Sequence, residues 1–199
     1  MVTSTSETSP QRHRYGPDPS QFADLHLPAG RRRPGTVVLI HGGWWGPKYG
    51  ADNLDRVAAD LAGRAKLAAG APGAAPTIHI AGVISLAGVL DLGAAARQKI
   101  GNGAATDFMG GAPGERTERY AVADPLPQVP IPAIVRCVHA QADDRVPFAE
   151  SVTYVAAARA AGQDAQLLEV NGDHFSITDT AAPTWPTVIN ALEELMGAA

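Results

Sequence analysis

Three short motifs in this chain combine residue types that can stabilise a developing negative charge or move a proton. In the first, HGGWW at 41–45, two glycines let the backbone turn sharply and aim N–H groups at one point, as an oxyanion hole requires. In the second, ADDRVP at 142–147, Asp143 can orient a histidine and stabilise its imidazolium form. In the third, GDHF at 172–175, His174 can act as general base and acid.

Each motif also fits a purely structural role, as a Gly-Gly turn with packing tryptophans, a pair of turn-forming aspartates or a loop histidine. Their order favours the chemical interpretation, because each motif directly follows an apolar run. Those runs predict four buried strands, at 36–40, 78–86, 133–138 and 166–170. A short alternating segment predicts one more strand, at 22–28.

Helical patterns separate the predicted strands, and a loop-rich segment at 101–132 carries only one short helix. The predicted helices lie at 53–64, 93–99, 115–122 and 146–162, with a last one from about 184. Strands that alternate with helices predict an α/β fold with a mainly parallel sheet and flanking helices. Chemistry in such folds lies in the loops beyond the carboxyl ends of the strands, where all three motifs fall.

Length and charge bound the possible functions. The chain has 199 residues, with 16 Lys and Arg against 20 Asp and Glu, which gives a net charge of −4. This acidic balance argues against nucleic acid or an anionic membrane as a partner. A single cysteine excludes an internal disulfide framework. We expect a polar, disordered tail at 1–20 without a secretory signal, one domain at 21–199, and a cytoplasmic location.

With these motifs the sequence resembles the α/β-hydrolase family, in particular its esterase, dipeptidyl-peptidase-like and kynurenine-formamidase-like branch. The HGGxW pattern of that branch is matched at 41–45, its DxxVP loop at 143–147, and its DHF turn at 173–175. The resemblance implies that Asp143 is the acid and His174 the base of a catalytic triad. It places the oxyanion hole at His41, Gly42, Gly43 and Trp44. Trp45, Tyr49 and Phe108 could line an apolar substrate pocket, although core packing explains them equally well.

The family nucleophile, a serine in G-x-S-x-G, is missing from this sequence. Ser85 lies inside a predicted strand, where its hydroxyl would not stand at a turn, and Cys137 fits a buried strand position. The segment that should carry the serine, two strands and two helices of roughly 50–70 residues, would fall near 63–66. We therefore expect an α/β-hydrolase-type sheet truncated by an internal deletion. Its open edges would favour self-association.

Three interpretations of function stay open. The resemblance implies a serine hydrolase acting on carboxylic ester or aryl/acyl amide bonds, inactive or impaired in this chain because the nucleophile is missing. A non-catalytic remnant that binds a ligand or a partner is the alternative. A metal hydrolase is the third; it would use His79, His139, Asp143 and His174, whose spacing matches no ligand motif. We therefore expect no metal and no cofactor, with a small ester or amide as substrate.

Overall fold

The computed structural model describes residues 11–14, 16–17, 19, 22–25, 36–38 and 80–197. The chain divides into two compact units, Met1–Thr36 and Val37–Ala199, and each is described by itself. The motif at 41–45, the predicted helix at 53–64 and the expected deletion point at 63–66 lie outside the described residues.

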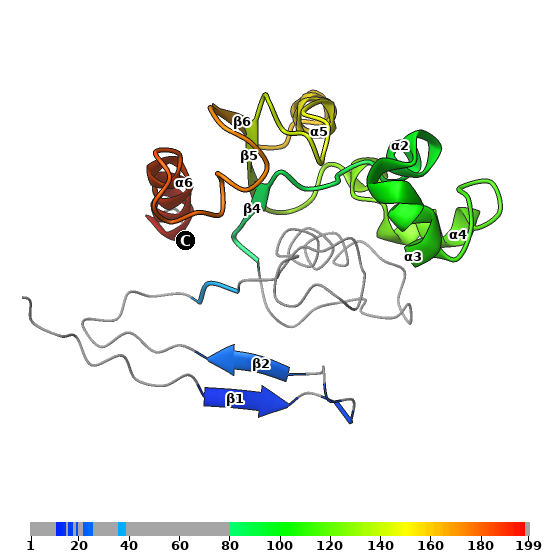
Figure 1. Cartoon of the computed structure of the whole chain (residues 1–199), viewed down its shortest axis with the longest axis horizontal. Helices are drawn as coiled ribbons and strands as arrows, with labels where there is room; N and C mark the ends of the chain where they lie inside the picture. Colours follow the sequence, from blue (N-terminus) through cyan, green and yellow to red (C-terminus); the bar gives the residue numbers. More distant parts are fainter. Residues whose placement is uncertain are drawn as a thin grey trace, which may run out of the picture. The chain divides into compact units, whose positions relative to one another are not determined.

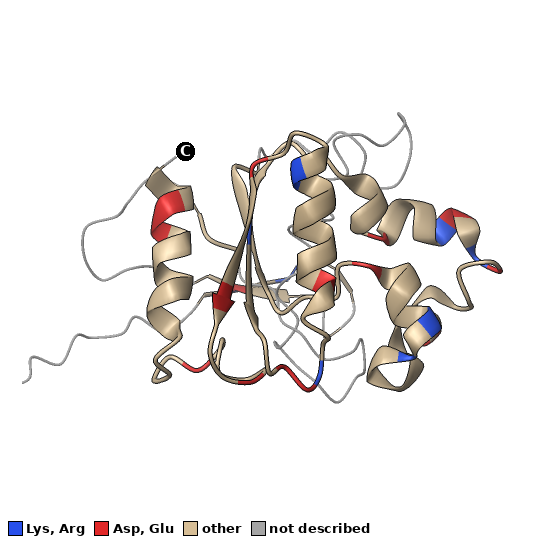
Figure 2. Ribbon diagram, turned by 90° about the horizontal axis from the view of Figure 1, so that it is seen from above, with Lys and Arg blue, Asp and Glu red and all other residues tan. Residues whose placement is uncertain are grey.

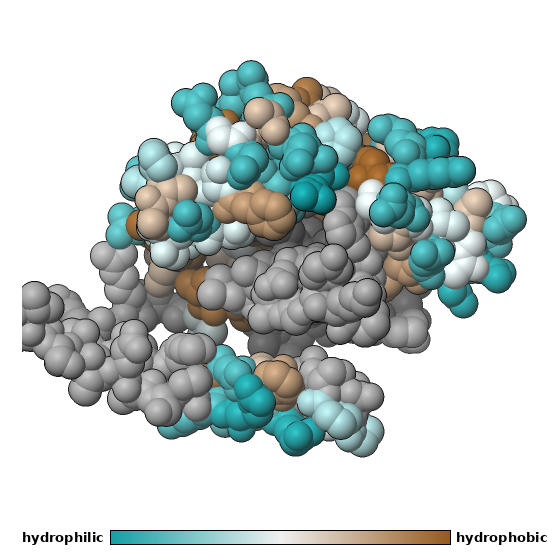
Figure 3. All heavy atoms as spheres, viewed as in Figure 1, coloured by the Kyte–Doolittle hydropathy of each residue, from teal (hydrophilic) through white to brown (hydrophobic). Residues whose placement is uncertain are grey.

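The first unit contains an antiparallel strand pair (Figure 1). β1 (Gln11–Arg14) pairs with β2 (Phe22–Leu25), with Arg12 opposite Asp24. The Arg12 guanidinium donates to both carboxylate oxygens of Asp24, at 2.8 and 2.7 Å, and lies 3.7 Å from the centre of the Phe22 ring. The visible face of these strands is mostly hydrophilic (Figure 3).

The strand β1 corrects part of our expectation for the tail, since 11–14 lies inside the segment 1–20 that we expected to be disordered. All four of its residues are exposed, so the strand leaves no apolar signature in the sequence. A cross-strand charge pair and a cation–π contact support it instead. The predicted strand at 22–28 is present as β2, and 26–28 lie outside the described residues.

A parallel three-stranded sheet forms the centre of the second unit (Figure 1). Its strands, in spatial order, are β4 (Gly82–Leu86), β5 (Ile134–Ala140) and β6 (Ala165–Val170). These positions confirm the strands predicted at 78–86, 133–138 and 166–170, with β5 running two residues further than expected. The unit therefore has an α/β fold.

Helices connect the strands and follow the last one. Between β4 and β5 lie α2 (Leu92–Gln98), η2 (Ile100–Gly103), α3 (Ala104–Met109), α4 (Thr117–Ala123) and η3 (Leu126–Gln128). The remaining two are α5 (Ala149–Ala160), between β5 and β6, and α6 (Trp185–Gly197), after β6. The sequence predicted α2, α4, α5 and α6. It did not predict α3 or the two short 3₁₀ helices η2 and η3, which fall mostly in the segment assigned to a loop.

The sheet is covered on both faces, with α5 on one side and α6 on the other (Figure 2). Alternating residues of the strands supply the two cores, as the period of two in a strand requires. Val83, Val135 and Cys137 pack with residues of α5 in one cluster. Val138 packs with Val188 of α6 in the other. Odd-numbered residues of β5 thus face α5, and even-numbered ones face α6.

The predicted strand at 36–40 is wrong for the part that the structure describes. Residues 36–38 have no strand pairing, and the side chains of Val37 and Val38 are 43% and 64% exposed. Valines this exposed gain little from burial, which is what holds a central parallel strand in place. Among the described strands, β4 pairs only with β5, so no described strand covers its other edge. None of the helices in the described part of the chain has the length and apolar character needed to cross a bilayer.

Candidate active site

Asp143 and His174 meet at the carboxyl edge of the sheet. The register pairs Ala140 at the end of β5 with Val170 at the end of β6, so the loops that follow these two strands start side by side. Asp143 lies three residues beyond one strand end and His174 four beyond the other. The Nδ1 atom of His174 lies 2.8 Å from Oδ2 of Asp143. The pair expected from the sequence is therefore in hydrogen-bond contact.

The carboxylate of Asp143 is fully enclosed, with 0% of its side chain exposed. Its Oδ1 accepts the backbone N–H groups of Arg145 and Val146, both at 2.8 Å. Its Oδ2 faces the rings of His174, at 2.8 Å, and of His139, at 3.3 Å. Four donors match the four lone-pair positions of an ionised carboxylate.

These contacts fix the charge state of Asp143. Burial by itself raises the pKa of a carboxyl group, because it disfavours the charged form. Here the hydrogen bonds, those involving His139 and His174 foremost, outweigh burial and hold the pKa of Asp143 well below its usual range. The group is an anion at neutral pH.

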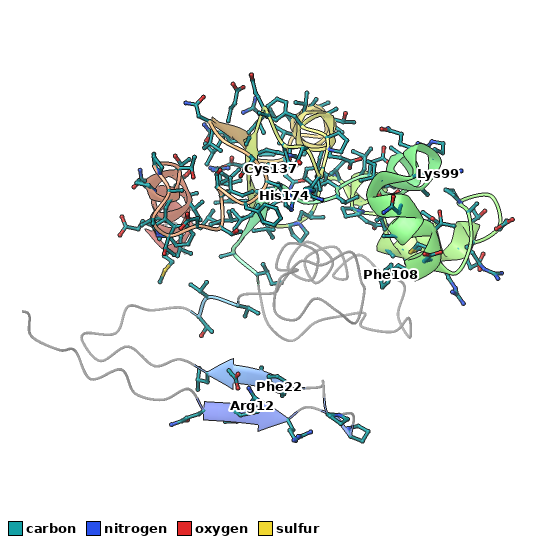
Figure 4. The ribbon with its side chains drawn as sticks, in the orientation of Figure 1. Arg12, Phe22, Lys99, Phe108, Cys137 and His174 are labelled. Atoms are coloured by element: carbon teal, nitrogen blue, oxygen red, sulfur yellow. The ribbon has the colours of Figure 1, made fainter. Side chains whose placement is uncertain are left out.

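The arrangement also orients the imidazole of His174. Its Nδ1 must carry a proton, because the Asp143 carboxylate opposite can only accept. In the neutral ring the lone pair is then on Nε2, and no described residue forms a hydrogen bond with that atom. The side chain is 26% exposed, and the ring of Phe175 packs edge-on at 5.4 Å between centroids. His174 thus presents a basic nitrogen on a fixed, partly exposed ring (Figure 4).

The turn that carries His174 is built by its neighbours. The carboxylate of Asp173 accepts the N–H groups of Phe175, at 3.1 Å, and Ser176, at 2.9 Å, and the Ser176 hydroxyl, at 2.7 Å. Gly172 has φ +114° and lies so close to Ser176 that a Cβ would come within 2.5 Å of its Oγ. Only glycine accepts both the positive φ and this contact. The segment 172–176 therefore determines where the imidazole stands.

The other predicted site residues do not join this pair in the described structure. Phe108 lies on α3, 49% exposed, and is well separated from His174 (Figure 4). The predicted oxyanion-hole residues and the other two pocket residues lie outside the described residues: His41, Gly42, Gly43, Trp44, Trp45 and Tyr49.

No nucleophile stands beside His174 among the described serines. Ser85 lies within β4, is 1% exposed, and accepts the N–H of Gly88 at 3.3 Å. The hydroxyl of Ser151 contacts His139, and that of Ser176 contacts Asp173. Cys137, within β5, is also fully buried. The site therefore contains a base and its orienting acid, without a described hydroxyl or thiol in position to attack a substrate.

His139 is the residue of this site whose role the sequence analysis missed. We placed it at the end of a strand and considered it only as a metal ligand. In the structure it lies inside β5, is 0% exposed, and touches the Asp143 carboxylate. Successive residues of a strand point to opposite faces, so His139 lies on the same face as Val135 and Cys137, which pack against α5. Among the described residues, no group of three or more His, Cys, Asp or Glu side chains could hold a metal ion.

Two further buried carboxylates bind the segment between β4 and α2. One oxygen of Glu150 accepts the N–H groups of both Leu90 and Asp91, at 3.0 and 2.8 Å. The two oxygens of Asp124 accept one N–H each, from Leu92 at 2.9 Å and Gly93 at 3.0 Å.

Burial raises the pKa of Glu150 to about 7, although its two N–H partners act in the opposite direction. Burial also raises the pKa of Asp124. Glu150 is in the first turn of α5, the helix that follows the Asp143 loop.

A known protein shares the fold of this chain but does not establish its family. No family model and no curated protein matches the sequence. A bifunctional GH43-CE protein from Bacteroides eggerthii superimposes with a TM-score of 0.53 at 19% identity, over 74% of this chain and 23% of the other. The chain thus spans about a quarter of the length of that protein. This likeness supports the α/β fold alone.

A second solved structure has lower similarity. It is a thermophilic esterase from the Planctomycetes species Thermogutta terrifontis, with butyrate bound. It matches with a TM-score of 0.34 and 17% identity, over 45% of this chain and 34% of the other.

Proposed function

We propose that this chain is an α/β-hydrolase-type protein whose Asp143–His174 pair is the acid–base part of a site for hydrolysing carboxylic esters or acyl amides. The observation that carries the proposal is the 2.8 Å contact between a fully enclosed carboxylate and a partly exposed imidazole, on adjacent loops beyond parallel strands. The similarity to the GH43-CE protein supports the fold only, so the chemistry rests on this pair.

The pair could work by ordinary general acid–base catalysis. The Nε2 atom of His174 would take a proton from an attacking water molecule as the water oxygen bonds to the substrate carbonyl carbon. The imidazolium formed would be stabilised by Asp143, which stays ionised throughout. His174 would then return the proton to the departing alcohol or amine when the ester or amide bond breaks. Backbone N–H groups of 41–45 remain our candidates for stabilising the oxyanion.

We also propose that acyl transfer is impaired in this chain, because its sequence has no G-x-S-x-G motif. A site that keeps its oxyanion donors and binding groups but loses the nucleophile retains an acceleration of about 10³- to 10⁴-fold over the uncatalysed reaction without help from the triad. Activation of a water molecule by His174 as general base would add a further factor of about 10² to 10⁴. We attribute the loss to an internal deletion near 63–66. The proposal predicts slow, His174-dependent hydrolysis without a covalent acyl-enzyme.

Two measurements on the full chain test this function. The first is the hydrolysis of p-nitrophenyl butyrate by the wild type, by His174→Ala and by Asp143→Asn, with His13→Ala as the control. His13 is an exposed histidine in β1, so its loss reports catalysis by any surface imidazole. The second is intact-protein mass spectrometry after treatment with a fluorophosphonate, which reacts with activated serines.

We expect hydrolysis above background that both site variants slow by at least about 100-fold, the lower end of the factor that general-base catalysis contributes. His13→Ala should leave the rate unchanged, and the protein mass should remain at 20.6 kDa. A fluorophosphonate adduct would show that a serine is activated after all, and peptide mapping would locate it. Equal rates for the wild type and His174→Ala would contradict the proposed chemistry.

The second candidate function is a non-catalytic protein that binds a ligand or a partner. It is favoured by the lack of a described serine bonded to His174 and by the edge of β4 that no described strand covers. An unpaired sheet edge presents backbone donors and acceptors that another chain can pair with. Loss of His174-dependent hydrolysis together with a concentration-dependent oligomer would support this function instead.

A further inference from the structure

We propose that His139 is a positioning residue that locks the Asp143 carboxylate in the orientation His174 requires, with Ser151 locking His139 in turn. Its relevance to catalysis rests on the function proposed above. A chain of contacts runs from Ser151 in α5 through His139 in β5 to Asp143 in the loop after β5.

The contacts assign the hydrogen positions in this chain. The Nε2 atom of His139 lies 3.1 Å from the carbonyl oxygen of Val146 and 3.3 Å from Oδ2 of Asp143. Both of these atoms can only accept, so Nε2 carries a hydrogen that the two acceptors share. On the other side of the ring, Nδ1 lies 2.8 Å from Oγ of Ser151. In the neutral ring Nδ1 accepts, so the Ser151 hydroxyl donates.

Ser151, His139 and Asp143 have the connectivity of a catalytic triad, but burial rules out direct catalysis. The side chain of His139 and the residue Ser151 are 0% exposed, and Asp143 is equally enclosed. A substrate cannot reach this serine in the folded chain. A buried, fully bonded chain of this kind instead fixes the position of its last member.

The carboxylate needs this support because its two oxygens are held by different means. Two backbone N–H groups of the loop fix Oδ1 of Asp143. They leave Oδ2 free to move as the carboxylate turns about its Cβ–Cγ bond. Apart from His139, the described donor to Oδ2 is His174, whose side chain is 26% exposed. His139 supplies a second donor to Oδ2 from the rigid interior of β5. The edge-on contact of its ring with Phe148, at 5.5 Å between centroids, limits the movement of the imidazole.

The test measures the hydrogen bond directly, so it does not depend on hydrolysis. Proton NMR of the full chain at pH 7 would give the rate at which the Nδ1–H of His174 exchanges with water. The variants are His139→Phe, which removes the polar contacts of both ring nitrogens, and His139→Gln, whose amide can still donate to Asp143. Ser151→Ala tests the outer link with a minimal change in volume. Val155→Ala is the matched control, a buried truncation in the same helix as Ser151 that removes no hydrogen bond.

We expect exchange about tenfold faster in His139→Phe, the factor that corresponds to one weakened hydrogen bond to a charged group. Ser151→Ala should give a smaller increase, and His139→Gln should restore most of the protection. Val155→Ala should leave the exchange rate unchanged. The Ser151→Ala result keeps the test valid if His139→Phe does not fold.

Equal exchange rates in His139→Phe and the wild type would overturn the proposal, because His139 would then be only a packing residue. If His139→Phe does not fold, equal rates in Ser151→Ala, Val155→Ala and the wild type would overturn it, because the contact with Ser151 would then not help to hold the site. A different result would contradict the proposed function, namely equal hydrolysis rates for the wild type and His174→Ala. If exchange changes as expected while the wild type shows no hydrolysis, the positioning role stands and the catalytic role falls.

Discussion

Replacing Glu150 by glutamine should remove a pH dependence of stability that the fold builds into this position. Glu150 is 5% exposed, and a single carboxylate oxygen accepts the N–H groups of Leu90 and Asp91. The amide oxygen of glutamine can accept both, so the substitution keeps these hydrogen bonds. What it removes is the negative charge, which lies in a buried site near the carboxylates of Asp91 and Asp124.

The magnitude follows from the pKa of Glu150, which rises from 4.5 to about 7 on folding, burial being the main cause. The folded chain binds this proton more tightly than the unfolded chain does. The stabilisation is therefore complete below pH 4.5 and is lost as the pH rises through 7. One pKa unit corresponds to 1.36 kcal/mol, so the loss between these limits is about 3 kcal/mol.

Urea unfolding followed by far-UV circular dichroism, at pH values from 4 to 8, measures this effect. As the pH rises from 4 to 8, the unfolding free energy of the wild type should fall by about 3 kcal/mol relative to that of Glu150→Gln. Glu118→Gln, at an exposed position in α4, is the control and should show no such change. Parallel curves for Glu150→Gln and the wild type would refute the reasoning, because the buried charge would then carry no cost.

Three further predictions concern Asp124, Arg136 and Val38. Asp124→Asn should lower the unfolding free energy by about 1–3 kcal/mol in urea titrations, because its two oxygens each accept one N–H and asparagine keeps one acceptor; an unchanged midpoint would contradict this. The Arg136 side chain is 6% exposed and forms ion pairs with Asp164 and Glu194. Removing both carboxylates leaves the buried guanidinium charge unpaired, whereas Arg136→Met leaves no buried charge, so the double variant should have the lower melting temperature. Val38 is an apolar side chain that is 64% exposed, so it can contribute to contacts between copies of the chain. Sedimentation velocity should show self-association that increases with concentration and weakens in Val38→Lys; a monomer at all concentrations would contradict this prediction.

The sequence by itself determined the elements whose signals are local. The apolar runs that became β4, β5 and β6 are short and continuous, as strands buried on both faces are, and the helix patterns between them marked α5 and α6. The order of strand, loop and polar residue placed Asp143 and His174 at one edge of the sheet, and the resemblance to the α/β-hydrolase family implied that they pair. Parallel neighbours bring the loops after them to one edge, whatever the details of packing.

Local signals failed where an element is too short to show a period. The helix α3 has six residues between glycines with positive φ, Gly103 and Gly110, so the sequence there resembles a loop. The strand β1 has no buried residue, and a pairing with Asp24 and Phe22 supports it. In both cases the element depends on its neighbours rather than on its own composition.

Only the tertiary structure decided how the site is held together. The role of His139 depends on the loop after β5 folding back, so that Asp143 reaches a ring inside the strand, and on α5 placing Ser151 against the other nitrogen. The pKa of Glu150 depends on burial against a segment 60 residues away in the chain. Spacing in a sequence cannot indicate such contacts, because burial and hydrogen-bond partners are properties of the packed chain, and they set the charge and orientation of each group.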